Sequence, residues 1–316
     1  MMPIRTAVIG VGYLGKYHAE KYARLEKSRL VAVVDTDARI AADVAARHGT
    51  RALTDYRELL GQVDAVSIVV PTSMHHAVAR EFLQHGVHVL VEKPITQTVE
   101  EADELIALAR KHRLVLQVGH LERFNAALLA LDEIIREPRF IESHRLSPFK
   151  TRATDVNVIL DLMIHDIDII LNLVKSELQD IDASGARVLS STIDIANARL
   201  RFANGCIANV TASRISLKAE RKMRIFQSNC YISVDFQNRI LSRHAKGDGE
   251  SAPGIPNIES RETIYENDDA LQSEIAAFLA AIENNTPPLV SGEDGRRALQ
   301  TATEITRLLK EQMLDV

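Results

Sequence analysis

The sequence predicts an α/β fold in two parts: an N-terminal doubly wound parallel sheet and a C-terminal α+β domain with an open-faced, largely antiparallel sheet. Two observations predict it. Up to about residue 120, short β-branched apolar runs alternate with helical patterns, as in a βαβ series. From about residue 180, apolar residues recur at every second position, which is typical of strands with one solvated face. We therefore expect domains over 1–121 and 122–316, with the C-terminal helix free to pack back on the first.

Composition excludes several classes of function. The chain has 316 residues and a net charge of -5, so it lacks the dense positive face of a nonspecific nucleic-acid binder. Aromatic residues make up only 4%, which argues against base-stacking platforms. No apolar run approaches the roughly 20 residues that a membrane helix needs. Two cysteines, Cys206 and Cys230, are too few for a disulfide scaffold, and we expect a cytoplasmic protein.

The first domain is predicted from buried strands that end in Gly, Asp, Pro or Glu. The pattern predicts a six-stranded series and locates five of its strands, at 6–9, 30–34, 64–70, 87–91 and 114–118. Thr98 and Glu101 have the spacing of a capping box for a helix up to His112. In a doubly wound sheet, ligands bind beyond the carboxyl ends of the strands. Gly10, Asp35, Pro71, Glu92 and Gly119 all lie at that edge.

A glycine-rich turn follows the first strand, with the sequence Gly10-Val-Gly12-Tyr-Leu-Gly15. Gly10 permits the tight turn, Gly12 lets the backbone approach a pyrophosphate, and Gly15 allows close packing of helix on strand. Asp35 ends the second strand, 20 residues beyond Gly15, where its carboxylate can bind ribose hydroxyls and repel a 2′-phosphate. The sequence therefore predicts a dinucleotide-binding Rossmann domain that prefers NAD to NADP.

The second domain is predicted from its change in periodicity. We expect strands at 140–146, 196–202, 207–210, 221–227, 231–236 and 240–243, with a hairpin turn at Asn204-Gly205. Helices are expected at 123–136, 157–174, 270–283 and 292–313, and a mobile loop at 246–259. Because an open sheet face normally needs a partner, we expect a homodimer or homotetramer formed through this sheet.

Four segments resemble motifs of the Gfo/Idh/MocA oxidoreductases: Gly10–Gly15, Pro71-Thr72-Ser-Met-His75, Glu92-Lys93-Pro94 and Asp161-Leu-Met-Ile-His165. The likeness covers essentially the whole chain, including the late 291–295 turn. It implies a Rossmann domain, an open-faced sheet, and reversible hydride transfer between a nicotinamide and a sugar, polyol or related carbonyl. Segments 119–125 and 161–168 are similar to a subgroup that oxidises the 3-hydroxyl of UDP-N-acetylglucosamine.

The resemblance implies that Lys93 and His165 are the catalytic pair and that Asp161 is a substrate or catalytic partner. Alcohol oxidation needs a base for the hydroxyl proton and positive charge near the developing alkoxide. Histidine titrates near neutral pH and suits the first task, while Lys93 supplies the second. Asp161 precedes His165 by four residues, so the two side chains share a helix face. The family often holds the proline after this lysine in the cis form.

The remaining site residues follow from the same motifs. Cofactor-binding residues are expected to be Gly10, Gly12, Tyr13, Leu14, Gly15, Asp35, Pro71, Thr72, His75, Glu92 and Lys93. Substrate-binding residues are expected to be Lys93, His120, Arg123, Asn125, Asp161 and His165. Arg123 fits either a bidentate contact to a diphosphate or a structural salt bridge. Arg145, Lys150 and Arg152 could engage a diphosphate, but each alone is better interpreted as a solvated charge. No metal site is expected.

Three functional hypotheses remain open. The first is an NAD-dependent sugar-nucleotide dehydrogenase acting at a ring hydroxyl, and the second is a dehydrogenase of a free sugar, inositol or other polyol. Stabilisation by uridine diphosphate alone would separate these two. The third is a noncatalytic NAD-binding sensor, against which the joint presence of Lys93, Asp161 and His165 argues.

Overall fold

The computed structural model describes residues 2–131, 134–149, 156–266 and 269–313. Its contacts divide the chain into two compact units. Unit 1 contains Met1–Leu121 and Asp269–Leu299, and unit 2 contains Glu122–Asp268 and Gln300–Val316. Lys150 and Arg152 lie outside the described residues.

Unit 1 is built on a parallel sheet in the order β3-β2-β1-β4-β5-β6. The strand order reverses between β1 and β4, and such a switch point opens a crevice at the carboxyl ends of the strands. The strands are β1 (Ile4–Ile9), β2 (Ser28–Val34), β3 (Arg51–Leu53), β4 (Ala65–Ile68), β5 (His88–Glu92) and β6 (Leu116–Gly119). The predicted doubly wound parallel sheet is confirmed. The short edge strand β3 is the one that the apolar pattern did not locate.

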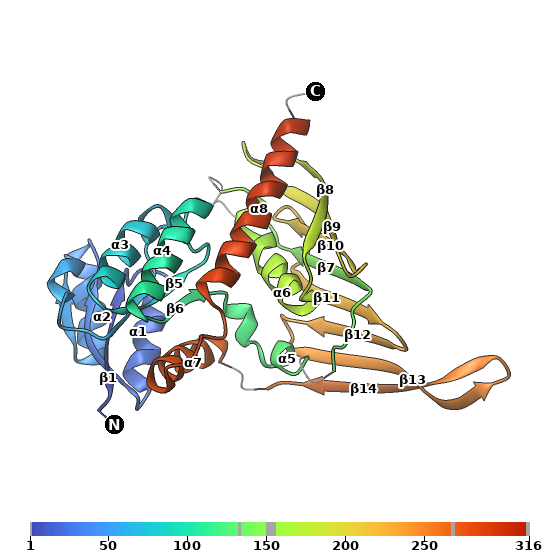
Figure 1. Ribbon diagram of the computed structural model, residues 1–316, viewed down its shortest axis with the longest axis horizontal. Helices are drawn as coiled ribbons and strands as arrows, with labels where there is room; N and C mark the ends of the chain where they lie inside the picture. Colours follow the sequence, from blue (N-terminus) through green and yellow to red (C-terminus); the bar gives the residue numbers. More distant parts are fainter. Residues whose placement is uncertain (1, 132–133, 150–155, 267–268, 314–316) are drawn as a thin grey trace. The chain divides into compact units, whose positions relative to one another are not determined.

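Right-handed crossovers that run in opposite directions from β1 and β4 place helices on both faces of this sheet (Figure 1). The helices are α1 (Gly15–Arg24), α2 (Ala38–His48), the 3-10 turn η1 (Tyr56–Leu59), α3 (Thr72–Gln84), α4 (Val99–His112) and α7 (Ala270–Asn284). The capping box of Thr98 and Glu101 at the start of α4 is confirmed. On one face, Tyr22 of α1 shares a fully buried cluster with Ile275 and Phe278 of α7. The late helix α7 thus completes the core of unit 1.

Unit 2 carries a mixed sheet in the order β14-β13-β12-β11-β7-β10-β9-β8, in which only the β7–β10 pairing is parallel. Its strands are β7 (Phe140–Leu146), β8 (Leu178–Ala186), β9 (Ile195–Phe202), β10 (Ile207–Ser213), β11 (Glu220–Gln227), β12 (Cys230–Asp235), β13 (Ile240–Ala252) and β14 (Ile255–Ile264). The prediction of a largely antiparallel sheet is confirmed.

One face of this sheet is covered by helices, and the other carries polar side chains together with the stacked rings of Phe226, Tyr231 and His244. The helix α6 (Ile164–Val174) packs on β7 and β10, and the end of α8 (Gly292–Gln312) contacts β8, where Leu309 lies beside Gly185. As predicted, the apolar residues of β9 alternate, so Ala198 and Leu200 are buried while Arg199 lies on the opposite face. There a shallow hollow of about 240 Å³ is lined by Asp182, Ala183, Ser184, Asn197, Arg199 and Asn209.

Two predicted elements of unit 2 were wrong. Residues 246–259 form a hairpin of β13 and β14 rather than a mobile loop, and Figure 1 shows it as a long ribbon. The glycines there serve the hairpin, because Gly249 and Gly254 adopt positive φ at the register shifts and the turn. The helix expected at 123–136 is replaced by short turns at η2 (Leu121–Phe124) and α5 (Ala126–Leu129). Asn125 stops the first and caps the second by accepting a hydrogen bond from the N–H of Ala127.

Across the described ranges, the structure has no helix that is both long and apolar enough to cross a membrane. The two cysteines are unpaired, with Cys206 buried and Cys230 partly exposed.

Candidate active site

The glycine-rich turn joins β1 to α1 with the geometry that dinucleotide binding requires. Gly10 has φ +84°, and a Cβ there would lie 2.6 Å from the carbonyl oxygen of Val69. A Cβ on Gly15 would lie 1.8 Å from the carbonyl oxygen of Gly10. At Gly12, by contrast, no described atom lies within 4 Å of the Cβ position. Two of the glycines are thus dictated by packing within the protein, and the third leaves open space beside the backbone.

The start of α1 is suited to an anion. Its first N–H groups have no side-chain cap at Leu14 in the described part of the chain. Free N–H groups and the positive end of a helix dipole favour phosphate. Tyr13 and Leu14, in the turn itself, are 66% and 50% exposed, so both side chains are accessible to a bound molecule.

Asp35 lies at the end of β2, beside this turn. Its Oδ2 accepts a hydrogen bond from the N–H of Val11 at 3.0 Å, and its Oδ1 accepts one from the N–H of Asp37 at 3.0 Å. Both oxygens are therefore oriented by backbone. The carboxylate borders a hollow of about 220 Å³ lined by Ile9, Gly10, Gly12, Val34, Asp35, Thr36, Thr54, Tyr56, Val69, Val70, Pro71, Met74 and Val78. A small apolar hollow with a carboxylate at its rim fits the adenosine half of a dinucleotide.

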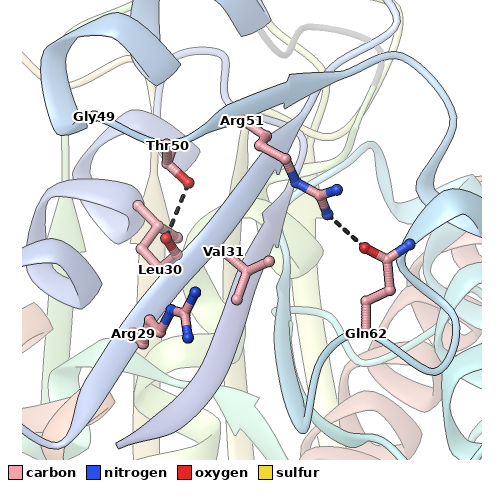
Figure 2. A pocket seen from close by; sticks show the side chains of 7 residues that line it. All are labelled: Arg29, Leu30, Val31, Gly49, Thr50, Arg51 and Gln62. Carbon is pink, nitrogen blue, oxygen red and sulfur yellow. Dashed lines mark hydrogen bonds between the residues drawn. The ribbon is translucent and has the colours of Figure 1, made fainter.

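A second, larger hollow of about 560 Å³ lies at the amino ends of β2 and β3 (Figure 2). Arg51 donates a hydrogen bond to the side chain of Gln62 at 2.7 Å, and Thr50 donates one to the backbone carbonyl of Leu30 at 2.9 Å, so these polar groups have partners within the protein. Because ligands of doubly wound sheets bind at the carboxyl edge, this hollow is at the wrong end for the cofactor. Size alone does not identify the site.

Lys93 follows β5 directly, and its backbone is held on both sides. Its N–H donates a hydrogen bond to Oε2 of Glu92 at 3.2 Å. The next peptide bond, Lys93–Pro94, is cis, as the resemblance implies. The ring nitrogens of His75 lie 2.9 Å from the carbonyl oxygens of Pro94 and Val70. His75 is buried, and this burial lowers its pKa. The structure thus places His75 beneath the Lys93–Pro94 segment and outside the residues that line the 220 Å³ hollow.

Glu92, which precedes Lys93, forms a cluster with His18 and Glu274, contributed by β5, α1 and α7; His18 and Glu274 are buried and Glu92 is partly exposed. Nε2 of His18 is 3.2 Å from Oε1 of Glu92, and the donor atoms of all three side chains lie within 4.8 Å of one another. Burial opposes ionisation of Glu92, but the hydrogen bond and charge of His18 and the charge of Lys93 lower its pKa. Burial, together with the charge of Glu92, raises the pKa of Glu274 well above 4.5. A proton on Glu274 removes the repulsion between the two carboxylates.

We expect Glu274→Gln to stabilise the protein at neutral pH. The folded state holds a proton on Glu274 that the unfolded chain releases above its ordinary pKa of 4.5. Stability from this group is therefore complete below that pH and is lost as the pH rises towards the folded-state pKa. Melting curves between about pH 5 and pH 8 should show the variant gaining over the parent as pH rises.

The matched control is Glu283→Gln on the same helix, because Glu283 contacts Lys27 rather than a second carboxylate. Its replacement should give no gain that grows with pH. A Glu274→Gln protein that is less stable than the parent at every pH would contradict a neutral Glu274.

In unit 2, Asp161 and His165 lie at the start of a buried helix. Asn157 accepts hydrogen bonds from the N–H groups of Ile159 and Leu160, which begins a π-helical turn, η3 (Ile159–Met163), that leads into α6. Asp161 is in this turn and His165 is the second residue of α6, and both are partly exposed. Such π turns are frequent at functional sites.

Five charged residues on and beside this helix are paired, and all but Glu122 are buried. Arg145 of β7 contacts Asp166 with Nε and Nη2, at 3.1 Å and 2.9 Å, and Glu122 with Nη1 at 2.9 Å. Arg145 is only 4% exposed, so its interpretation as a solvated charge was wrong. Nη1 of Arg123 lies 3.4 Å from Oδ1 of Asp168, which is the geometry of the structural salt bridge.

His120 and Asn125, two further expected substrate residues, are also buried, at 1% and 6% exposure. The amide of Asn125 caps α5 and donates to the carbonyl of Phe236 at 3.4 Å. The expectation that His120, Arg123 and Asn125 touch substrate stays a prediction.

Sequence reasoning missed several residues that the structure places at the sites. Thr54 and Tyr56 line the 220 Å³ hollow, but they lie between the predicted strands and carry no motif. Tyr56 donates to Glu81 at 2.8 Å, and its burial, with the charge of Glu81, raises its pKa to about 12. Glu274 was not recognised as a site residue, because it lies in a helix with an ordinary amphipathic pattern. A carboxylate on the apolar face of that helix was the available signal.

Comparison with known proteins gives matches over both halves of the chain. The family model described as the NAD-binding Rossmann fold of an oxidoreductase family matches residues 4–120. The model of the GFO/IDH/MocA C-terminal domain matches residues 135–233.

Individual relatives extend this similarity over nearly the full length. UDP-N-acetylglucosamine 3-dehydrogenase of Acidithiobacillus ferrooxidans is 44% identical over 306 residues, covering 96% of this chain and 97% of that protein. A solved structure of that enzyme, GnnA, has a TM-score of 0.93 and covers 98% of this chain and 99% of that one. Inositol 2-dehydrogenase of Rhizobium meliloti is 27% identical over 328 residues, covering 98% of each chain.

Proposed function

This chain belongs to the GFO/IDH/MocA family of NAD-binding Rossmann oxidoreductases, and on that premise we propose that it oxidises the 3-hydroxyl of a UDP-N-acetyl-hexosamine. The observation that carries the substrate is the 44% identity, over 96% of the chain, to an enzyme named for UDP-N-acetylglucosamine. The inositol dehydrogenases are more distant relatives, at 24% to 27% identity over comparable lengths. A sugar nucleotide is therefore favoured over a free polyol, and a dehydrogenase over a noncatalytic sensor.

In this proposal, the residues of unit 1 hold the cofactor. The N–H groups at the start of α1 and the open backbone at Gly12 receive the pyrophosphate, and Asp35 binds the adenosine ribose. Tyr13, Leu14, Gly15, Pro71 and Thr72 border the same edge of the sheet. When bound, NAD accepts the hydride from the sugar carbon. Glu92 and His75 hold the segment from which Lys93 projects.

The chemical roles follow from the side chains themselves. His165 takes the proton of the 3-hydroxyl as the C–H bond gives up its hydride, leaving a ketone. Lys93 donates a hydrogen bond to the developing alkoxide, and its positive charge stabilises that oxygen. Asp161, four residues before His165, orients the imidazole or binds a neighbouring hydroxyl. His120, Arg123 and Asn125 are proposed to shape the substrate site.

The assembly and the location are part of the same proposal. The polar face of the unit 2 sheet, which carries Arg199 and Asn209, is proposed to form a homodimer or homotetramer. A cytoplasmic location remains a prediction.

The decisive experiment is to mix stoichiometric protein, NAD and UDP-N-acetylglucosamine and to record the absorbance of the reduced nicotinamide. Stoichiometric amounts matter, because an unfavourable equilibrium or retained NADH would hide steady-state turnover. A rise in the reduced-cofactor band is expected. No rise, with NAD binding demonstrated, would reject this substrate and lead to a panel of free sugars and inositols. Thermal stabilisation by uridine diphosphate alone distinguishes the two classes.

Asp35 should set the choice between cofactors. We expect the parent to bind NAD more tightly than NADP, because the carboxylate repels a 2′-phosphate. Asp35→Ala should reduce that preference by about tenfold or more, the equivalent of about 1.4 kcal/mol. Titration of both proteins with both cofactors measures this. The control is Asp37→Ala, because Asp37 caps the next helix through the N–H of Arg39 and does not line the hollow. An unchanged preference in Asp35→Ala would contradict the assignment.

A further inference from the structure

A chain of ion pairs, buried at Asp166 and Arg145 and exposed at Arg221, runs from α6 through β7 to β11 within unit 2. Asp166 contacts Arg145, Arg145 contacts Glu122, and Nη1 of Arg221 lies 3.5 Å from Oε1 of Glu122. Arg145 and Arg221 are direct neighbours in the β7–β11 register, so the sheet places both guanidinium groups beside Glu122. We call these four residues the Arg145 network.

The Arg145 network contacts α6 at the first turn of that helix, through Asp166. Met163, the N-cap of α6, makes no side-chain capping bond within the described residues, and the π-helical turn η3 precedes it. The two contacts from Arg145 to Asp166 form a bidentate fork, which fixes orientation as well as distance. The next residue towards the N-terminus is His165, which is partly exposed, whereas Asp166 is 1% exposed. The side chains of Asp166 and His165 thus start from the same turn of α6 and point in different directions.

Stability does not explain this arrangement. The helix α6 already buries Ile164, Ile167, Ile169 and Ile170 completely, so apolar packing holds it on the sheet. The free energy needed to transfer two charges from water into such surroundings is similar in size to their attraction. Apolar replacements of buried ion pairs are therefore often neutral or stabilising. We therefore interpret the buried, bidentate ion pair of Arg145 and Asp166 as fixing the orientation of α6 rather than adding stability.

We propose that Arg145 is a positioning residue for the reaction: by clamping Asp166, it fixes the turn of α6 from which His165 projects. The inference rests on the proposed function, in which His165 is the base. The inference concerns geometry, because replacing Arg145 and Asp166 together removes one positive and one negative charge, and Glu122 keeps its contact with Arg221. Arg123 and Asp168 form a comparable contact one turn further along α6.

The test is the paired variant Arg145→Met/Asp166→Leu, which replaces both charges with apolar groups of similar size. The melting temperature, the Kd for NAD and the KM for the sugar nucleotide should stay close to the parent values. The kcat should fall by about 10²-fold, as expected when a reacting group is misplaced by about 1 Å. The control changes an exposed pair of α8 within unit 2, in Arg307→Gln/Glu304→Gln, which should leave kcat unchanged. An unchanged kcat in the first variant, or equal losses in kcat, NAD affinity and stability, would overturn the proposal.

Two further measurements keep the inference testable. If the paired variant does not fold, Arg145→Lys keeps the charge but loses the fork, and it should show the same loss of kcat at unchanged KM. In ¹⁵N-histidine spectra, the His165 ring signals should shift or broaden in the variants while those of His144 stay in place. This readout needs no turnover. Absence of turnover in the parent would therefore reject the proposed function, whereas unchanged His165 signals would reject the positioning role.

Discussion

His165→Asn should lower kcat by about 10²-fold to 10⁴-fold, the contribution typical of a general base, while leaving the Kd for NAD unchanged. Asparagine keeps a polar group of similar reach but cannot accept the hydroxyl proton. His165 belongs to unit 2, whereas the glycine turn and Asp35 belong to unit 1, so the substitution leaves the cofactor residues intact. Single-turnover formation of NADH and titration of NAD binding measure the two quantities separately.

The matched control is His144→Asn on β7, a partly exposed histidine of the same unit that lies near Glu142 and Glu220. It should retain turnover. A His165→Asn protein with nearly undiminished turnover would show that another group removes the proton. Loss of NAD binding in the variant would instead indicate that the substitution disturbs the fold beyond its own site.

The parts of the structure that the sequence could predict depend on local steric rules. Gly10 needs positive φ and Gly15 needs a missing Cβ, and both requirements arise from atoms within a few residues or on the next strand. The buried strands were recognisable because a parallel sheet covered on both faces demands unbroken apolar runs. The alternation along β9 was recognisable for the opposite reason, since one face of that sheet is polar.

The parts that could not be predicted depend on partners that are distant in sequence. Arg145 is a buried clamp only because β7 places it against Asp166, 21 residues later. Glu274 meets Glu92 only because α7 returns to pack on α1. Residues 246–259 contain glycine and proline in numbers typical of a loop, but they continue the pairing that begins between Ile240 and Ile264 and pair with one another, as Lys246 does with Ile258. Composition cannot report such pairing.

The two glycines Gly12 and Gly15 should respond in opposite ways to the same added methyl group. In Gly15→Ala the new Cβ would lie 1.8 Å from the carbonyl oxygen of Gly10, so the backbone of the turn must move. We expect a loss of about 3 kcal/mol or more in the free energy of unfolding, at or above the upper end of overpacking costs. Urea unfolding of parent and variant measures this loss, and NAD binding should disappear with the turn.

Gly12→Ala should instead fold like the parent, because no described atom lies within 4 Å of its Cβ position. The change in stability should stay within about 0.5 kcal/mol, as for an unconstrained surface position. The space beside Gly12 is where the turn exposes its backbone, and a methyl group there would keep a pyrophosphate from the N–H groups of α1. Losing one such charged hydrogen bond, about 1.5–3 kcal/mol, should weaken NAD binding by about tenfold to a hundredfold. If Gly12→Ala bound NAD as tightly as the parent, the pyrophosphate would have to lie elsewhere, and the glycine turn would be a feature of the fold alone.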